Sequence, residues 1–144
     1  MQLKQISEWV NKDDMEVLLS DGEIKSWLLE KGPITKRIKL NHNFELNLIR
    51  DEVDQISQDD KVFLDNIEGD IKVREVILLG NGDPLVYAKS YIPTFTINDG
   101  LKNLFQKKET LFTKFLYLKN EHWGRKSKYH VNGLPLSVME VFLI

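Results

Sequence analysis

The sequence predicts an α+β fold in which a single antiparallel β-sheet of about six strands has helices packed on one face. Two pairs of apolar-alternating stretches are each divided by a glycine-containing turn, at Gly80–Asp83 and at Asn132-Gly133. The clearest helix signals come before both of these stretches. Strands joined by hairpins, without helices between them, are typical of antiparallel sheets.

Length and composition agree with one globular domain over residues 1–144, with 42% hydrophobic and 29% charged residues. The chain has no cysteine, which excludes disulfides, thiolate metal sites and cysteine nucleophiles. A net charge of −2 argues against a general nucleic-acid binder. No apolar run approaches the ~18 residues of a membrane span, and the polar N-terminus lacks the apolar part of a secretory signal. We therefore expect a cytoplasmic protein with no membrane or nucleic-acid partner.

The first expected elements are helices. A short helix is expected around Ile6–Val10. A second should begin at Ser20 or Asp21, with Glu23 at capping-box spacing, and stop at Gly32-Pro33.

Strands are expected from Pro33 onward. Apolar alternation predicts two strands, Ile34–Leu40 and Leu46–Leu48, joined across Asn41–Asn43. The charged stretch Asp51–Asp60 is interpreted as a solvated turn. The clearest hairpin follows, with strands Ile71–Leu79 and Leu85–Ile92.

The last third of the chain should complete the sheet. Residues Asn98–Gln106 are expected to form one or two helical turns, and Leu111–Leu118 a strand. A final hairpin should join Lys126–Val131 to Leu134–Leu143.

Most common functional motifs are absent from the sequence. Gly80–Gly82 lacks the third glycine of a dinucleotide-binding loop, and neither a P-loop nor a GxSxG elbow occurs. His42, His122 and His130 have no metal-type spacing, so no metal is expected. The basic and aromatic stretch His122–His130 is interpreted as an exposed strand face, in preference to a nucleic-acid surface.

Two charges interrupt apolar strand faces. Glu140 alternates with Val138 and Phe142, and either Arg74 or Glu75 must also face an apolar layer. Arg74 and Glu140 could form a buried structural ion pair, or Glu140 could lie at a hydrated edge of the sheet. Alternatively, an arginine and a carboxylate in an apolar pocket could bind a small planar anion.

An ordered set of motifs over roughly residues 20–144 resembles the chorismate lyase family. The matching segments are Trp27–Leu29, Thr35–Arg37, Arg74–Leu78, Gly82–Ser90, Ile92-Pro93, Trp123–Ser127, Gly133–Leu136 and Glu140–Leu143.

The resemblance implies a cofactor-free lyase that converts chorismate to 4-hydroxybenzoate and pyruvate, the first step toward ubiquinone. It also implies a monomer with an antiparallel sheet, helices on one side and a closed ligand cavity. By resemblance, Arg74 and Glu140 are the catalytic residues. Arg74 and the backbone amide of Ile34 bind the ring carboxylate, and Glu140 faces the ring hydroxyl.

Two departures from the family pattern affect the expected site. Lys89 stands where the family commonly has arginine, and it keeps the charge without the bidentate fork. Since chorismate is a dianion, Lys89 is the expected partner of its second carboxylate, ahead of Lys36 and Arg37. The covering segment is shortened to Thr94–Asn103, where Gly100 or Leu101 would supply a further backbone contact.

A ligand-sensing domain without chemistry is the alternative to a lyase. The sensing domains of GntR-type transcription regulators share this fold and a similar strand–turn–strand pattern. The chain has no room for a winged-helix DNA-binding domain, and those regulators do not generally combine the elements at Trp123–Ser127 and Glu140–Leu143. The sequence therefore favours the lyase.

Overall fold

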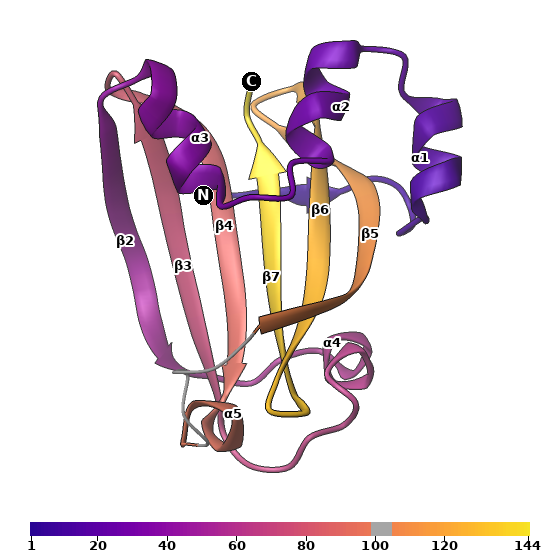
Figure 1. Cartoon of the computed structure of the whole chain (residues 1–144), viewed down its shortest axis with the longest axis vertical. Helices are drawn as coiled ribbons and strands as arrows, with labels where there is room; N and C mark the ends of the chain where they lie inside the picture. Colours follow the sequence, from indigo (N-terminus) through magenta and orange to yellow (C-terminus); the bar gives the residue numbers. More distant parts are fainter. Residues whose placement is uncertain (99–104) are drawn as a thin grey trace.

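A seven-stranded antiparallel sheet dominates the computed structural model, which describes residues 1–98 and 105–144 (Figure 1). The strand order is β1-β5-β6-β7-β4-β3-β2. The predicted α+β class is confirmed, with seven strands in place of about six. The strands are β1 (Lys4–Gln5), β2 (Phe44–Val53), β3 (Ile71–Gly80), β4 (Asp83–Pro93), β5 (Phe105–Tyr117), β6 (Asn120–Val131) and β7 (Leu134–Phe142). The helices are α1 (Lys12–Leu18), α2 (Gly22–Leu28), α3 (Ile34–Asn41), α4 (Gln58–Phe63) and α5 (Thr94–Asn98).

Two predicted hairpins are confirmed, β3–β4 and β6–β7. Each turns on an Asn-Gly pair in the left-handed region: φ is 51° and 82° at Asn81-Gly82, and 52° and 81° at Asn132-Gly133. This geometry matches the twist of the adjoining strands, which is why Asn-Gly predicts hairpins well.

The helix start predicted at Ser20 or Asp21 is also confirmed, but α2 ends at Leu28, before the predicted stop at Gly32-Pro33. Asp21 caps α2, since its Oδ1 accepts hydrogen bonds from the amides of Glu23 and Ile24 at 2.9 and 3.1 Å. The helix expected at Ile6–Val10 is wrong. That segment is extended instead, and Val10 pairs with Phe112 of β5.

The predicted strand Ile34–Leu40 is wrong as well, because these residues form α3. Ile34 and Ile38 are 4% and 0% exposed, whereas Leu40 is 73% exposed. The buried pair is spaced by one helical turn, and the apparent alternation came from a leucine that faces solvent.

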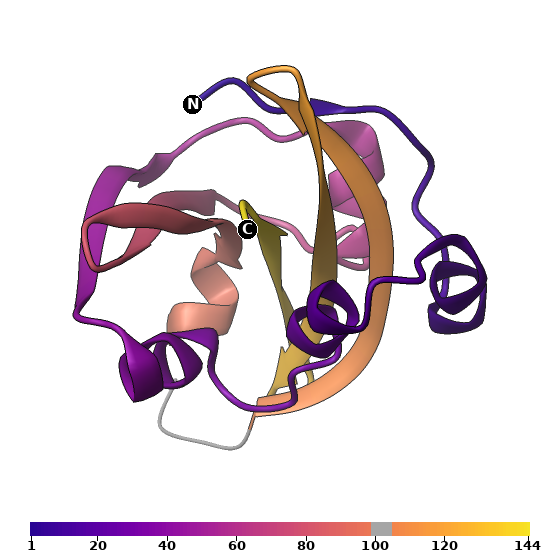
Figure 2. The ribbon, with the colours of Figure 1, turned by 90° about the horizontal axis from the view of Figure 1, so that it is seen from above.

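Helices α1, α2 and α3 cover one face of the sheet, the helix face (Figure 2). Its core combines residues of these helices with strand residues; the strand residues are Val76, Leu78, Val86, Ala88, Phe112, Trp123 and Phe142. The opposite face has a smaller cluster around Tyr87, Phe115 and Val141, packed against Leu3 and Trp9 of the N-terminal segment.

Helix α4 corrects the expectation that all helices lie on one face. It begins in the stretch Asp51–Asp60, expected to be a solvated turn, and continues to Phe63. Ser57 caps it, and its Phe63 ring lies 4.4 Å from the ammonium of Lys126 on the opposite face. The charges of this segment obscured a short helix whose one aromatic residue, Phe63, is half-buried.

The basic stretch His122–His130 lies in β6, between β5 and β7. The strand is as predicted, but its face is not exposed: Lys126 also lies 4.6 Å from the ring of Trp9, and Lys128 pairs with Asp65 at 2.8 Å. Among the described residues, no helix is both long and apolar enough to cross a membrane.

Candidate active site

A buried ion pair lies at the centre of the helix face. Glu140 of β7 is opposite Arg125 of β6, and the guanidinium Nε donates to Oε1 of the carboxylate at 2.9 Å. Arg125 is 3% exposed, and its Nη1 also donates to the carbonyls of Leu28 and Glu30 at 2.9 and 2.8 Å. These contacts satisfy the buried guanidinium and tie Glu140 to the end of α2.

Sequence reasoning missed Arg125, although the signal for it was available. The two-residue turn at Asn132-Gly133 makes Val131 and Leu134 partners, and counting outward in equal steps places Arg125 opposite Glu140. A recognised hairpin turn therefore identifies the partner of an inward-facing charge.

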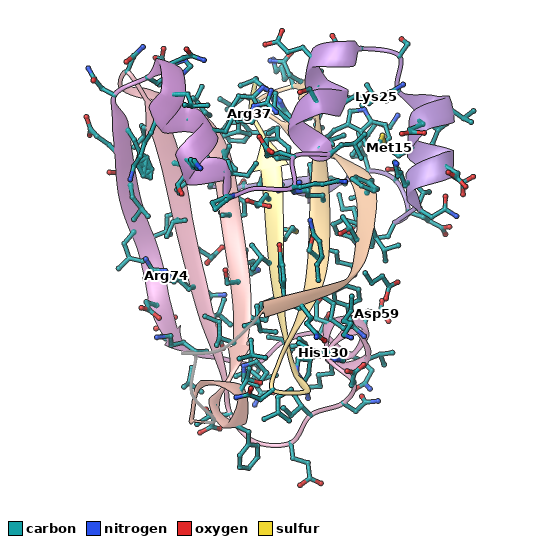
Figure 3. The ribbon with its side chains drawn as sticks, viewed as in Figure 1. Met15, Lys25, Arg37, Asp59, Arg74 and His130 are labelled. Carbon is teal, nitrogen blue, oxygen red and sulfur yellow. The ribbon has the colours of Figure 1, made fainter. Side chains whose placement is uncertain are left out.

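Arg74 lies on the same face, toward the β2 edge of the sheet (Figure 3). Its Nη1 is 3.2 Å from Asp51 of β2, and its side chain is 37% exposed. The alternative of a buried Arg74–Glu140 pair is therefore wrong, because each residue has another partner.

The register relates Arg74 to Glu140. Glu140 is opposite Ala88 of β4, and Arg74 of β3 is opposite Ser90, two residues further along β4. With ~4.8 Å between strands and ~3.3 Å per residue, their Cα atoms are separated by about 12 Å along the sheet. Two long side chains can approach a small ring from both ends across that distance.

Ile34 begins α3, which packs over β2 and β3 on the helix face. Its side chain is 4% exposed in the core of that face. The first amides of a helix have no intrahelical partner, and the N-cap, Pro33, provides no side-chain cap. The Ile34 amide is thus able to donate to an anion.

A cavity of about 390 Å³ lies on this face, between the end of α2 and β5. Its lining residues are Lys12, Leu28, Leu29, Glu30, Lys31, Lys107, Thr110, Phe112 and Arg125. Figures 1 and 2 show the first part of β5 curving toward the helix side of the sheet. Lys107, Thr110 and Phe112 of this strand line the cavity. Four of the lining residues are basic and one is acidic, so the cavity suits an anion.

The pKa values of two side chains near this wall are shifted from their ordinary values. Burial and the nearby charge of Arg125 lower the pKa of Lys107, despite the opposing effect of Glu140. Burial, with the charge of Glu140 added, raises the pKa of the Tyr129 phenol. Both side chains therefore lie within electrostatic reach of the ion pair.

Lys89 lies on the opposite face, beside Glu75 of β3 and Met139 of β7. It lines a separate cavity of about 330 Å³, and its ammonium is 5.4 Å from the ring of Tyr91. The structure does not bring Lys89 together with Arg74 and Glu140.

Among the described residues, the structure does not bring the other side chains predicted for the site together with Arg74 and Glu140. Lys36 is exposed, and Arg37 is engaged elsewhere: it donates to the Ser26 carbonyl at 2.8 Å and lies 4.0 Å from the Trp27 ring. Gly100 and Leu101 lie outside the described residues. Within residues 1–98 and 105–144, no group of three or more potential metal-binding side chains occurs.

Comparisons with known proteins indicate a family. The family profile described as "Chorismate lyase" matches residues 3–122, which include Ile34 and Arg74. The chorismate pyruvate-lyase of Escherichia coli O7:K1 is 26% identical over 144 residues, covering 89% of this chain and 87% of its own. A "probable chorismate pyruvate-lyase" of Photobacterium profundum is 29% identical over 138 residues, covering 81% of this chain and 76% of its own.

Among solved structures, the fold is similar to that of a possible transcriptional regulator, YydK, from Bacillus subtilis. The TM-score is 0.58 at 16% identity. The similarity covers 79% of this chain and about 61% of the regulator's chain, and at this identity it concerns the fold alone.

Proposed function

Because the chain belongs to the chorismate lyase family, we propose that it converts chorismate to 4-hydroxybenzoate and pyruvate. The observation that supports this most directly is the carboxylate of Glu140, held by buried Arg125 on the sheet face that also presents Arg74. A rigidly held carboxylate and a guanidinium on one face suit a planar substrate with a polar group at each end.

The reaction is an elimination that needs orientation more than added chemical groups. The ether bond between the ring and the enolpyruvyl group breaks, and the neighbouring hydroxyl-bearing ring carbon loses its proton. The ring becomes aromatic, and the enolpyruvate gains a proton at its methylene carbon to become pyruvate. Aromatisation supplies the driving force, so the proposal includes no cofactor.

Each proposed residue acts on a different part of the substrate. Arg74 binds the ring carboxylate, assisted by the amide of Ile34 at the start of α3. Glu140 acts at the opposite end, where it accepts a hydrogen bond from the ring hydroxyl.

The proposal also includes the protein's oligomeric state, its location in the cell and the use of its product. Residues 1–144 act as one catalytic domain, a monomer in the cytoplasm, and its 4-hydroxybenzoate serves as the first intermediate toward ubiquinone. Chorismate and 4-hydroxybenzoate are its only proposed partners.

The first prediction tests this function with purified protein. Wild type should release pyruvate from chorismate. Glu140→Gln should lower the rate of single-turnover chorismate decay by about 100-fold or more while 4-hydroxybenzoate affinity changes much less, because the charge matters most in the transition state.

Arg74→Ala should instead weaken 4-hydroxybenzoate binding by about 2–5 kcal/mol, measured by calorimetry.

Exposed Glu45 of β2 provides a matched control, since Glu45→Gln removes a carboxylate away from the helix-face core. If wild type binds 4-hydroxybenzoate but releases no pyruvate, the ligand-sensing alternative replaces the lyase. Equal, small losses of rate and affinity in Glu140→Gln would make Glu140 a binding residue only.

A further inference from the structure

The substrate has one more carboxylate than the ring product. The proposed site provides Arg74 and the Ile34 amide for the ring carboxylate, while the enolpyruvyl carboxylate has no assigned partner. Resting on the proposed function, we propose that Lys107 of β5 binds the enolpyruvyl carboxylate of chorismate.

Lys107 is on the correct face of the sheet. It is opposite Tyr129 of β6, two strand positions along the face from Ser127 and four from Arg125. Lys107 and Arg125 both line the 390 Å³ cavity between α2 and β5. The cavity therefore has a lysine beside the ion pair that contains Glu140.

The ammonium of Lys107 is available to an incoming anion. Its closest ring is that of Tyr129, at 5.9 Å, and it has no ion pair with any residue in the described ranges. Partial desolvation and the repulsion of Arg125 lower its pKa, and the negative charge of a bound carboxylate would oppose both effects.

The other cations near the cavity are less suited to this role. Arg125 is already engaged by Glu140 and two backbone carbonyls, through its Nε and Nη1. Lys12 pairs with Glu16 at 3.9 Å on the surface. Lys31 and Lys107 are both exposed, but Lys31 lies in the loop after α2, whereas Lys107 lies on a strand of the helix face. The charges of both Arg125 and Glu140 act on the ammonium of Lys107.

Its position also suits the chemistry of the leaving group. When the ether bond breaks, negative charge moves onto the enolpyruvate that carries this carboxylate. A cation beside that group stabilises the charge as it develops, and the interaction is lost when pyruvate leaves. Lys107 thus distinguishes chorismate from 4-hydroxybenzoate.

The test is the contrast between substrate and product. In Lys107→Met, kcat/KM for chorismate should fall by about tenfold or more, because a charge-assisted contact is lost. The inhibition constant of 4-hydroxybenzoate should stay within about twofold of wild type, and Lys107→Arg should recover most of the substrate loss. Lys4→Met, on the edge strand β1, is the control for removing one lysine.

Three results would overturn the proposal: equal losses for substrate and product in Lys107→Met, no loss for either, or a substrate-only loss in Lys89→Met. If wild type releases no pyruvate, the proposed function fails separately. Calorimetry with chorismate and 4-hydroxybenzoate then decides about Lys107, because only chorismate binding should weaken in Lys107→Met.

Discussion

At the scale of single residues, Arg125 links the fold to the proposed chemistry. It is more deeply buried than Arg74, and it joins Glu140 on β7 to the last turn of α2. The residue that holds a catalytic carboxylate in place can matter as much as the carboxylate, because a loosely positioned group is a poor catalyst.

Replacing Arg125 should therefore destabilise the protein. Arg125→Met leaves the Glu140 carboxylate and the carbonyls of Leu28 and Glu30 without their donor, and the free energy of unfolding should fall by about 3–5 kcal/mol. Urea denaturation at neutral pH measures this. Adding Glu140→Leu to Arg125→Met should recover part of the loss, since no unpaired carboxylate then remains. A loss below about 1 kcal/mol would mean that water replaces the guanidinium.

At this scale, the sequence predicts which residues of one strand share a face, because they alternate. It does not predict which residues of distant strands share that face. Alternation identified Glu140 as an inward-facing charge and left Arg74 and Glu75 as alternatives; in the structure Arg74 shares the helix face with Glu140. Alternation alone could not show that Lys89 lies on the opposite face, or that Lys107 lies on the same one, since that depends on how strands pair across the sheet.

At the scale of elements, turn chemistry predicted structure better than apolar spacing. The two Asn-Gly hairpins formed as expected because few residues tolerate two consecutive positive φ values. The segment after Pro33 was mistaken for a strand because Leu40 continued an alternation without being buried. Whether an apolar residue is buried depends on the surface it meets, which a local pattern does not contain.

Strands β2, β3 and β4 are joined on the opposite face by a polar cluster. Glu75 of β3 accepts hydrogen bonds from Arg50 of β2 and Tyr87 of β4. Burial alone would raise the pKa of Glu75, but these hydrogen bonds, with the charge of Lys89, hold it below its ordinary value. Glu75 thus stabilises the fold above the pKa of an unfolded glutamate, and this contribution is lost as pH falls through its folded value.

The cluster predicts a defined response to acid. Between pH 7 and about pH 3, the free energy of unfolding of wild type should decrease, and that of Glu75→Gln should decrease less. Urea midpoints at several pH values measure the difference. Glu45→Gln, an exposed change on the neighbouring strand, should follow wild type. Parallel curves for Glu75→Gln and wild type would show that the cluster does not couple to folding.

At the scale of the whole molecule, both faces of the sheet are covered, by different parts of the chain. Helices α1 to α3 cover the helix face, and α4 with the N-terminal segment covers the other (Figure 2). The sequence predicted only the first layer, because α4 is short and polar apart from a few residues such as Phe63. A single aromatic contact is too small a signal to predict a second layer.

Charge is also distributed unevenly over the molecule. The net charge is −2, yet the helix-face cavity is lined by Lys12, Lys31 and Lys107, besides Arg125, which is paired with Glu140, and by a single acid, Glu30. Glu30 is itself 3.8 Å from Arg37, which reduces its effect on the cavity. A dianion would therefore be attracted to this opening despite the overall negative charge.

This distribution predicts that kcat/KM for chorismate falls with salt and that the exposed cavity lysines cause most of the fall. Raising NaCl from about 0.01 M to about 0.3 M shortens the Debye length well below ~30 Å, so kcat/KM for chorismate should fall. The double variant Lys12→Gln/Lys31→Gln should start lower at low salt and show a flatter slope, with kcat little changed, because these side chains attract substrate without touching the reacting atoms. Lys4→Gln/Lys61→Gln, which removes two exposed lysines outside the cavity lining, should keep the wild-type slope. Equal slopes in all three proteins would show that chorismate reaches the site from another side.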